Sequence, residues 1–226
     1  MSVGLDNPIW ASLETIHDHL ATGGDRCKRY PPSYAPFVGV AGASAEDVRA
    51  LVSLGETLFL LGTDFDFGPH LVVESVFEIQ QFTWCRDREI PPDEATDFQV
   101  ERLGPQHTDE IFEFASRYYP QFFRRQTAEL GTFFGLREAG RLIAISGERL
   151  GTPECAEMST VVVAPSHAGR GIGRQLARSS VLEMIQGHRT PFLHILTGNA
   201  RAIDLVTRAG FTPRRTFHLW MFKRIS

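Results

Sequence analysis

One stretch, residues 157–173, constrains the fold more than any other part of the chain. It reads EMSTVVVAPSHAGRGIG: an apolar β-branched run ends at Pro165, and three glycines at alternate positions follow. Proline donates no N–H and has a fixed φ, so it ends a strand. After the glycines, apolar residues recur every three or four positions, which predicts a helix. The order is therefore strand, glycine loop and helix.

A glycine loop that opens a helix predicts an anion site. Glycine lets the backbone approach a ligand closely, and the first turn of a helix offers unpaired N–H groups and the positive end of its dipole. Phosphate is the natural occupant. Arg174 and Gln175 stand where a nucleoside-triphosphatase loop needs Lys and Ser or Thr, and no third glycine follows at dinucleotide-binding spacing. A tight turn without a ligand is the alternative.

The loop resembles the coenzyme-A loop of the GNAT acetyltransferases, whose pattern is Gln/Arg-x-x-Gly-x-Gly/Ala. Residues 168–173 read Ala-Gly-Arg-Gly-Ile-Gly, so both required glycines are present and Ala168 replaces the usual Gln or Arg. The resemblance implies that backbone amides hold the pyrophosphate of acetyl-CoA. The cofactor-binding residues that it implies here are Ala168, Gly169, Arg170, Gly171, Ile172 and Gly173.

A second stretch, residues 199–211, also resembles GNAT enzymes. Their pattern is Asn-x-x-Ala-x-x-Leu-Tyr-x-x-x-Gly-Phe, and five positions match, whereas Val206 replaces the Tyr. The matching residues are Asn199, Ala202, Leu205, Gly210 and Phe211. With the preceding residues 190–194, TPFLH, this half is most similar to the branch related to glycine N-acyltransferase. The resemblance covers about residues 97–226.

The resemblance implies an α/β (α+β) GNAT fold, with a mixed central sheet of splayed strands flanked by helices. The splayed strands are expected at 157–164 and 192–198. Pantetheine would then pair with the freed backbone of Val161, Val162 and Val163, in the manner of an added strand. Asn199 is expected to bond the pantetheine arm or to cap its own helix.

Transfer of an acyl group to an amine needs a base for the amine proton, a hydrogen-bond donor for the oxyanion and neutralisation of the departing thiolate. Glu157 is the catalytic candidate, because it resembles the catalytic Glu of the histone-acetylating branch; a surface Glu at a strand end is the alternative. The backbone amide near Val161 is the candidate donor to the oxyanion. The usual acid is the Tyr that Val206 replaces. A thiol of pKa about 8.5 leaves tolerably without an acid, and substitutes are suggested by residue type alone: Tyr118, Tyr119, His194 and His218.

The first half of the chain carries no chemical motif. We expect residues 1–90 to form a smaller N-terminal α/β companion domain, which is often a degenerate GNAT-like half in this branch, and residues 97–226 to form the acetyltransferase domain. Residues 86–96, RDREIPPDEAT, read as a linker. Within these parts, 70–84 is predicted as a strand with an alternative short helix at 77–82, and 118–128 as a helix.

Composition excludes several classes of function. The net charge of −4 gives no electrostatic argument for nucleic acid. Three widely spaced cysteines show neither a disulfide framework nor metal spacing, so no metal is expected and a reducing compartment is favoured. No run approaches the ~18 apolar residues of a membrane span, and the first residues lack a signal-peptide pattern. A cytoplasmic monomer or dimer without membrane contact is expected.

The predicted function is an acetyl-CoA-dependent N-acetyltransferase that acts on a primary amine of a small molecule or amino acid. Tyr118, Tyr119 and Phe122 are expected to line an apolar acceptor pocket, with Arg124 or Arg125 for a carboxylate. The alternatives are a non-catalytic acyl-CoA-binding module, which Val206 motivates, and a protein or peptide N-acetyltransferase. A nucleotide-binding protein of another fold is disfavoured by the loop spacing. Neither the acceptor nor the length of the acyl group follows from the sequence.

Overall fold

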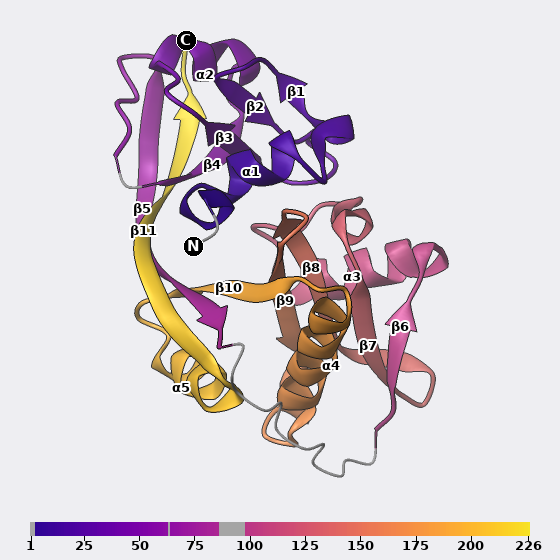
Figure 1. Cartoon of the computed structure of the whole chain (residues 1–226). Helices are drawn as coiled ribbons and strands as arrows, with labels where there is room; N and C mark the ends of the chain where they lie inside the picture. Colours follow the sequence, from indigo (N-terminus) through magenta and orange to yellow (C-terminus); the bar gives the residue numbers. More distant parts are fainter. Residues whose placement is uncertain (1–2, 63, 86–97) are drawn as a thin grey trace.

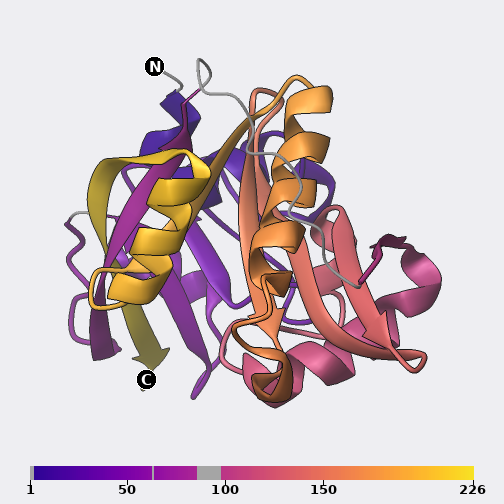
Figure 2. The same ribbon diagram turned by 90° about the horizontal axis from the view of Figure 1, so that it is seen from below.

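The computed structural model describes residues 3–62, 64–85 and 98–226, and its strands join in one mixed sheet (Figures 1 and 2). The strand order is β1-β2-β3-β4-β11-β5-β10-β9-β8-β7-β6. The strands are β1 (Thr22–Gly23), β2 (Cys27–Arg29), β3 (Phe37–Val40), β4 (Thr57–Gly62), β5 (Leu71–Trp84), β6 (Val100–Leu103), β7 (Phe133–Glu138), β8 (Arg141–Gly151), β9 (Cys155–Val163), β10 (Thr190–Leu196) and β11 (Phe211–Arg224). The helices are α1 (Pro8–Glu14), α2 (Ala45–Leu51), α3 (Thr108–Tyr118), α4 (Ile172–Gln186) and α5 (Ala200–Ala209).

Local sequence signals explain most of these boundaries. Ser44 and Asp47 form a capping box at the start of α2. Residues 71–84 are one continuous strand, so the alternative short helix at 77–82 is wrong. The helix predicted over 118–128 is also wrong: α3 ends at Tyr118, and only a 3-10 turn, Thr127–Leu130, follows. Pro120 explains this difference, because a residue that precedes proline, here Tyr119, is driven out of the helical region.

Two βαβ units and two crossing strands organise the centre of the sheet. β3, α2 and β4 form one parallel unit, and β9, α4 and β10 form the other. The strand that follows each unit pairs with the other unit: β5 follows β4 but pairs with β10, and β11 follows β10 but pairs with β4. Figure 1 shows these two long strands, in purple and yellow, running from one half to the other. The two halves of the chain are therefore interlocked through one sheet.

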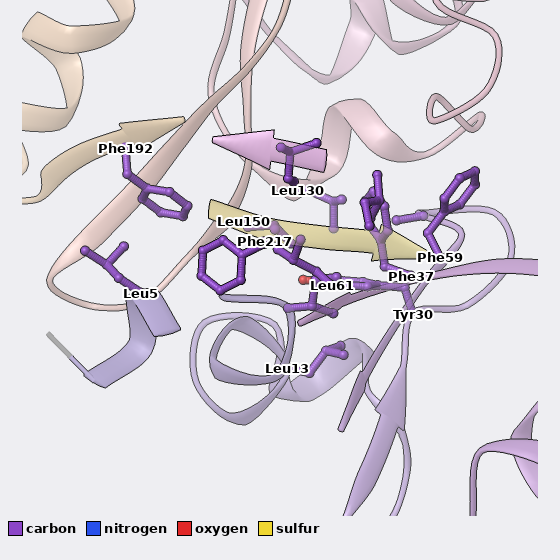
Figure 3. Close-up of a cluster of buried hydrophobic side chains, with 14 of the residues drawn as sticks. Leu5, Leu13, Tyr30, Phe37, Phe59, Leu61, Leu130, Leu150, Phe192 and Phe217 are labelled. Carbon is purple, nitrogen blue, oxygen red and sulfur yellow. The ribbon is translucent and has the colours of Figure 1, made fainter. Parts of the chain in front are cut away.

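The sheet separates hydrophobic cores that lie on its opposite faces. One cluster gathers α1, β3, β4 and the middle of β11, with Tyr30, Phe37 and Phe217 among its buried side chains (Figure 3). Another cluster packs α4 and α5 against β9 and β10, through Met158 and Val206. We call these the α1-side core and the α4-side core.

The predicted linker at 86–96 lies outside the described residues. Among the helices that the structure describes, none has the length and apolarity that a membrane crossing requires. The cysteines at positions 27, 85 and 155 are free thiols.

Candidate active site

The parallel strands β9 and β10 separate at the position predicted for the splay. Their ladder joins residues 155–157 to residues 190–192, and no pairing continues beyond Glu157 and Phe192. β9 goes on to Val163, paired on its other side with β8. The edge of residues 158–163 that faces β10 is thus not paired with that strand, and the pairing of Val161, Val162 and Val163 with pantetheine stays a prediction.

A β-bulge lies within this open stretch. The register with β8 shifts between Ser159 and Val162, so that two residues of β9 oppose one of β8. Thr160 has φ of +55°, a conformation that costs a β-branched residue free energy. Strain of this kind is held in place by its surroundings and gathers at functional sites. The bulge redirects the backbone next to Val161, the residue whose amide is the candidate donor to the oxyanion.

The glycine loop presents a run of backbone amides with no protein partner. Gly169 and Gly171 have φ of +82° and +77°, and Gly171 caps α4 without any side-chain hydrogen bond. Among the described residues, none accepts a hydrogen bond from the N–H of residues 169–173, whereas the N–H of Ala168 bonds to Pro165. Those five amides at the positive end of a 15-residue helix fit an anionic group.

A cavity of about 450 Å³ passes through the sheet where the strands part. Its wall includes Met158, Ala177 and Val206 of the α4-side core, and also Phe37, Ile79 and Leu150 of the α1-side core. Because these cores lie on opposite faces of the sheet, the cavity connects the two faces. Val161, Val162 and Asn199 line it, and so do Tyr119 and Phe122.

Glu157 lies in the wall of this cavity and is 1% exposed. Its Oε1 accepts a hydrogen bond from Nδ1 of His194 at 2.8 Å, and its Oε2 lies 3.4 Å from Nε of Arg149. Burial raises the pKa of Glu157, but the charge of Arg149 and the hydrogen bond from His194 outweigh burial and hold that pKa below its ordinary value. Glu157 is therefore a carboxylate at neutral pH.

The proton on His194 is fixed by Gln81. Oε1 of Gln81 accepts from Arg214, and its Nε2 donates to the carbonyl of Leu5, so the orientation of the amide is determined. The same Nε2 lies 3.1 Å from Nε2 of His194 and must donate to it. His194 is thus neutral, with its proton on Nδ1. Its Nδ1–H holds Oε1 of Glu157 in place, and the role of acid that residue type suggested stays a prediction.

The three acceptor residues predicted from sequence divide between two environments. Tyr119 and Phe122 line the cavity, and their rings lie 5.4 Å apart. Burial raises the pKa of Tyr119, so its hydroxyl stays protonated beside Arg149. Tyr118 lies outside the cavity, 36% exposed, with its ring against Phe114. It occupies the last turn of α3, before the chain turns inward at Tyr119.

At the second signature, Asn199 caps α5, since its side chain accepts a hydrogen bond from the amide of Ala202 at 3.1 Å. It also lines the cavity, so both of its predicted roles remain compatible. Val206 is 7% exposed within the α4-side core and also contacts the cavity.

Sequence reasoning missed Arg149 and Gln81, which together set the charge and geometry around Glu157. Arg149 lies eight positions before Glu157 on the adjacent strand, and its guanidinium stacks 4.7 Å from the ring centre of Phe37. The adjacent charges of Glu148 and Arg149 in a mostly apolar strand were the available signal, because buried charges need partners. No local pattern marks Gln81, since its contacts come from residues far away along the chain.

Comparisons with known proteins agree with this geometry. The model of the FR47-like protein family matches residues 133–221. A putative acetyltransferase of the GNAT family from Novosphingobium aromaticivorans superposes with a TM-score of 0.91 at 27% identity, over the full length of both chains. The chain belongs to the GNAT acetyltransferase superfamily. Its fold is the GNAT fold, a mixed sheet flanked by helices, as the sequence predicts.

Two further proteins match the fold alone or only part of the chain. A GCN5-related N-acetyltransferase-like protein from Streptococcus suis shares the fold at 10% identity, with a TM-score of 0.63 over 96% of this chain and 94% of that one. N-alpha-acetyltransferase RimI of Mycobacterium tuberculosis is 36% identical over 96 residues, which are 41% of this chain. The match spans 60% of the length of that relative.

Proposed function

We propose that this GNAT protein is an acetyl-CoA-dependent N-acetyltransferase that acts on a primary amine. The observation that carries the proposal is a set of three features that we interpret as one path: the unpartnered amides of residues 169–173, the open edge of β9, and a cavity whose wall includes both Arg174 and Glu157. The amides fit a pyrophosphate, and the open edge fits the amide groups of pantetheine. Acetyl-CoA supplies a thioester that an amine can attack.

The residues along this path account for the proton and charge requirements of the transfer. The amine nitrogen forms a bond to the acetyl carbon, the carbon–sulfur bond breaks, and the amine loses a proton. Glu157 is charged at neutral pH and is the group proposed to take that proton, directly or through a water molecule. The backbone amide beside the bulge at Thr160 is proposed to stabilise the negative charge on the carbonyl oxygen. The departing group is the thiolate of a thiol whose pKa is about 8.5, so it leaves near neutral pH without a proton from an acid.

The acceptor is proposed to be a small molecule. The cavity of about 450 Å³ suits a small amine, and most of the side chains that form its wall on the α1 side are buried. The RimI relative bears the name of an N-alpha-acetyltransferase, which motivates a protein or peptide N-terminus as the second candidate. Placement in the branch of glycine N-acyltransferase stays a prediction, based on the motif at 190–194.

We also propose that residues 1–90 and 97–226 are two GNAT-like halves. The support is the matching pair of βαβ units and the exchange of β5 and β11 between them. Only the second half keeps a glycine-rich loop before a long helix, since α2 has seven residues and α4 has fifteen. The cofactor is therefore assigned to the second half alone.

Calorimetry with acetyl-CoA and an assay of thiol release across a panel of amines test the proposal. Binding together with amine-dependent release supports the transferase, whereas binding without release for any amine supports the non-catalytic module. Absence of binding would remove both. Glu157→Gln should lower kcat by about 100-fold or more. Glu154→Gln, at an exposed residue just before β9, should leave kcat unchanged.

A further inference from the structure

We propose that the N-terminal part of the chain builds the acceptor chamber, and that the chamber takes a primary amine on an aromatic or branched aliphatic body without a carboxylate. This inference rests on the proposed function and names its substrate class. It also gives a role to residues 1–84, which carry no chemical motif. We define the acceptor chamber as the part of the cavity on the α1 side of the sheet.

Elements of the N-terminal part supply most of the apolar wall of the acceptor chamber. α1, β3, β4 and β5 each contribute at least one side chain, and β11 and β8 complete the wall. The residues are Ile9, Phe37, Leu61, Phe77, Ile79, Leu150 and Leu219. All of them belong to the α1-side core or pack against it. Figure 3 labels Phe37, Leu61 and Leu150 among the side chains of the α1-side core.

An aromatic contact joins the two halves of the chain at the wall of the acceptor chamber. Phe122, from the loop after α3, lies 6.3 Å from Phe37 in a stacked arrangement and 4.7 Å from Phe59. Tyr119 packs against the same Phe122 ring. The chamber is thus bounded by aromatic rings, which favour aromatic and branched apolar groups by burial and by ring contacts.

The charges in the acceptor chamber discriminate against an acceptor with a carboxylate. Among the described residues that line this side, the positive charge belongs to Arg149, which is already paired with Glu157 and stacked on Phe37. His194 is neutral, because Gln81 donates to its Nε2. A carboxylate would enter without a partner and lose its hydration, at a large cost in free energy. An amine, in contrast, meets the carboxylate of Glu157.

A longer acyl group on the cofactor is the other occupant that an apolar chamber admits. Glu157 and its partner Arg149 lie on the chamber side, whereas the glycine loop leads into α4 on the opposite face. The group that must lose a proton to Glu157 therefore approaches from the chamber. This assigns the chamber to the amine, and a comparison of acyl-CoA chain lengths separates the two occupants.

The test compares matched amines with acetyl-CoA held at saturation. We expect kcat/KM to rise from ethylamine to isoamylamine and 2-phenylethylamine, and to fall at least tenfold from 2-phenylethylamine to phenylalanine. Phe77→Ala should raise KM for 2-phenylethylamine about tenfold and leave KM for acetyl-CoA unchanged. Phe65→Ala is the matched control, because Phe65 is also a half-buried phenylalanine of the N-terminal part but packs in another core.

Several results would overturn the inference while leaving the proposed function intact. They are phenylalanine or a peptide as the better acceptor, an equal effect of Phe77→Ala and Phe65→Ala, and a rate that rises with acyl length whatever the amine. If acetyl-CoA binds but no amine is acetylated, the proposed function fails. The chamber is then tested by calorimetry of 2-phenylethylamine with CoA-saturated protein, where absence of binding, or binding that Phe77→Ala does not weaken, rejects it.

Discussion

Nδ1 of His194 donates to Oε1 of Glu157 at 2.8 Å, and the ring that donates is itself held by Gln81. This hydrogen bond leaves Oε2 of Glu157 facing Arg149. The carboxylate thus sits between a neutral donor and a cation, in a place where burial alone would favour its protonated form. The ionisation of Glu157 depends on Arg149, and this dependence is measurable.

Replacement of Arg149 by methionine should shift the low-pH side (the acid limb) of the profile of kcat/KM against pH to higher pH. With Arg149 in place the pKa of Glu157 is below its ordinary value, so the base is charged throughout the neutral range. Without that charge, burial dominates and raises the pKa, and the base is lost at a higher pH than in the wild type. The pH profiles of both proteins with one amine check this, because the ionisation of the amine is common to both.

Arg189→Met is the matched control for Arg149→Met. Arg189 forms an ion pair with another buried carboxylate, Glu148, at 2.9 Å, and that pair does not line the cavity. Its removal should destabilise the protein without displacing the acid limb. Superimposable acid limbs for Arg149→Met and the wild type would show that Arg149 does not set the ionisation of the base.

A comparison of alanine substitutions at Gly169 and Gly42 distinguishes an effect on cofactor binding from an effect of backbone strain. Both have a positive φ, +82° and +69°, and a Cβ added to either meets no atom within 4 Å. Alanine at each position should therefore destabilise the fold similarly, by about 1–2 kcal/mol. Only Gly169→Ala should raise KM for acetyl-CoA, because Gly42 lies in the loop of the first βαβ unit. Denaturant unfolding and steady-state kinetics measure the two effects. A similar rise in KM for both variants would count against the amide site.

The loop and the splay were predictable from sequence because each depends on residues adjacent in the chain. Glycines at alternate positions and the β-branched run before Pro165 specify strand, turn and helix locally. The second signature ending at Phe211 located the partner of that strand. Glu157 was found by its distance from the loop along the chain, and the structure adds that it is buried and charged.

The surroundings of Glu157 were not predictable, because they are assembled by contacts between distant residues. Gln81 reaches His194 only because β5 crosses over to pair with β10, an exchange that no local pattern encodes. The N-terminal wall of the acceptor chamber has the same origin, since Phe37 and Phe77 are ordinary apolar strand residues in the sequence. Tyr118 and Tyr119 illustrate the limit well: adjacent residues of the same type differ in environment because Pro120 ends the helix between them.

The buried hydroxyls of Ser146 and Ser180 join β8 to α4 through a hydrogen bond of 2.8 Å. Replacing either serine by alanine leaves the other hydroxyl buried without this partner, which should cost about 1–3 kcal/mol of unfolding free energy. The double variant should cost clearly less than the sum of the two single costs, since both polar groups are then absent. Urea unfolding of the three variants and the wild type completes the cycle. Additive costs would mean that each hydroxyl finds another partner.

Stability should fall on mild acidification because of His17, whose ring joins the two halves of the chain. Its Nε2 donates to the carbonyl of Leu130 at 2.9 Å, and its Nδ1 accepts from the hydroxyl of Tyr30 at 2.8 Å. Burial lowers the pKa of His17 in the folded state, more than the bond to Leu130 raises it. The unfolded chain, with a histidine pKa of about 6.5, therefore binds a proton that the folded chain does not.

The unfolding free energy should then decrease as the pH falls below about 6.5, until His17 also becomes protonated in the folded state. In His17→Gln, the side-chain amide can donate to Leu130 and accept from Tyr30 without titrating, so this part of the pH dependence should disappear. His188→Asn is the control, because His188 is exposed and asparagine tolerates its positive φ of 58°. Denaturant unfolding between pH 5 and pH 8 measures the slopes (about 1.4 kcal/mol per pH unit for one full proton). An equal slope in wild type and His17→Gln would assign the acid sensitivity to other groups.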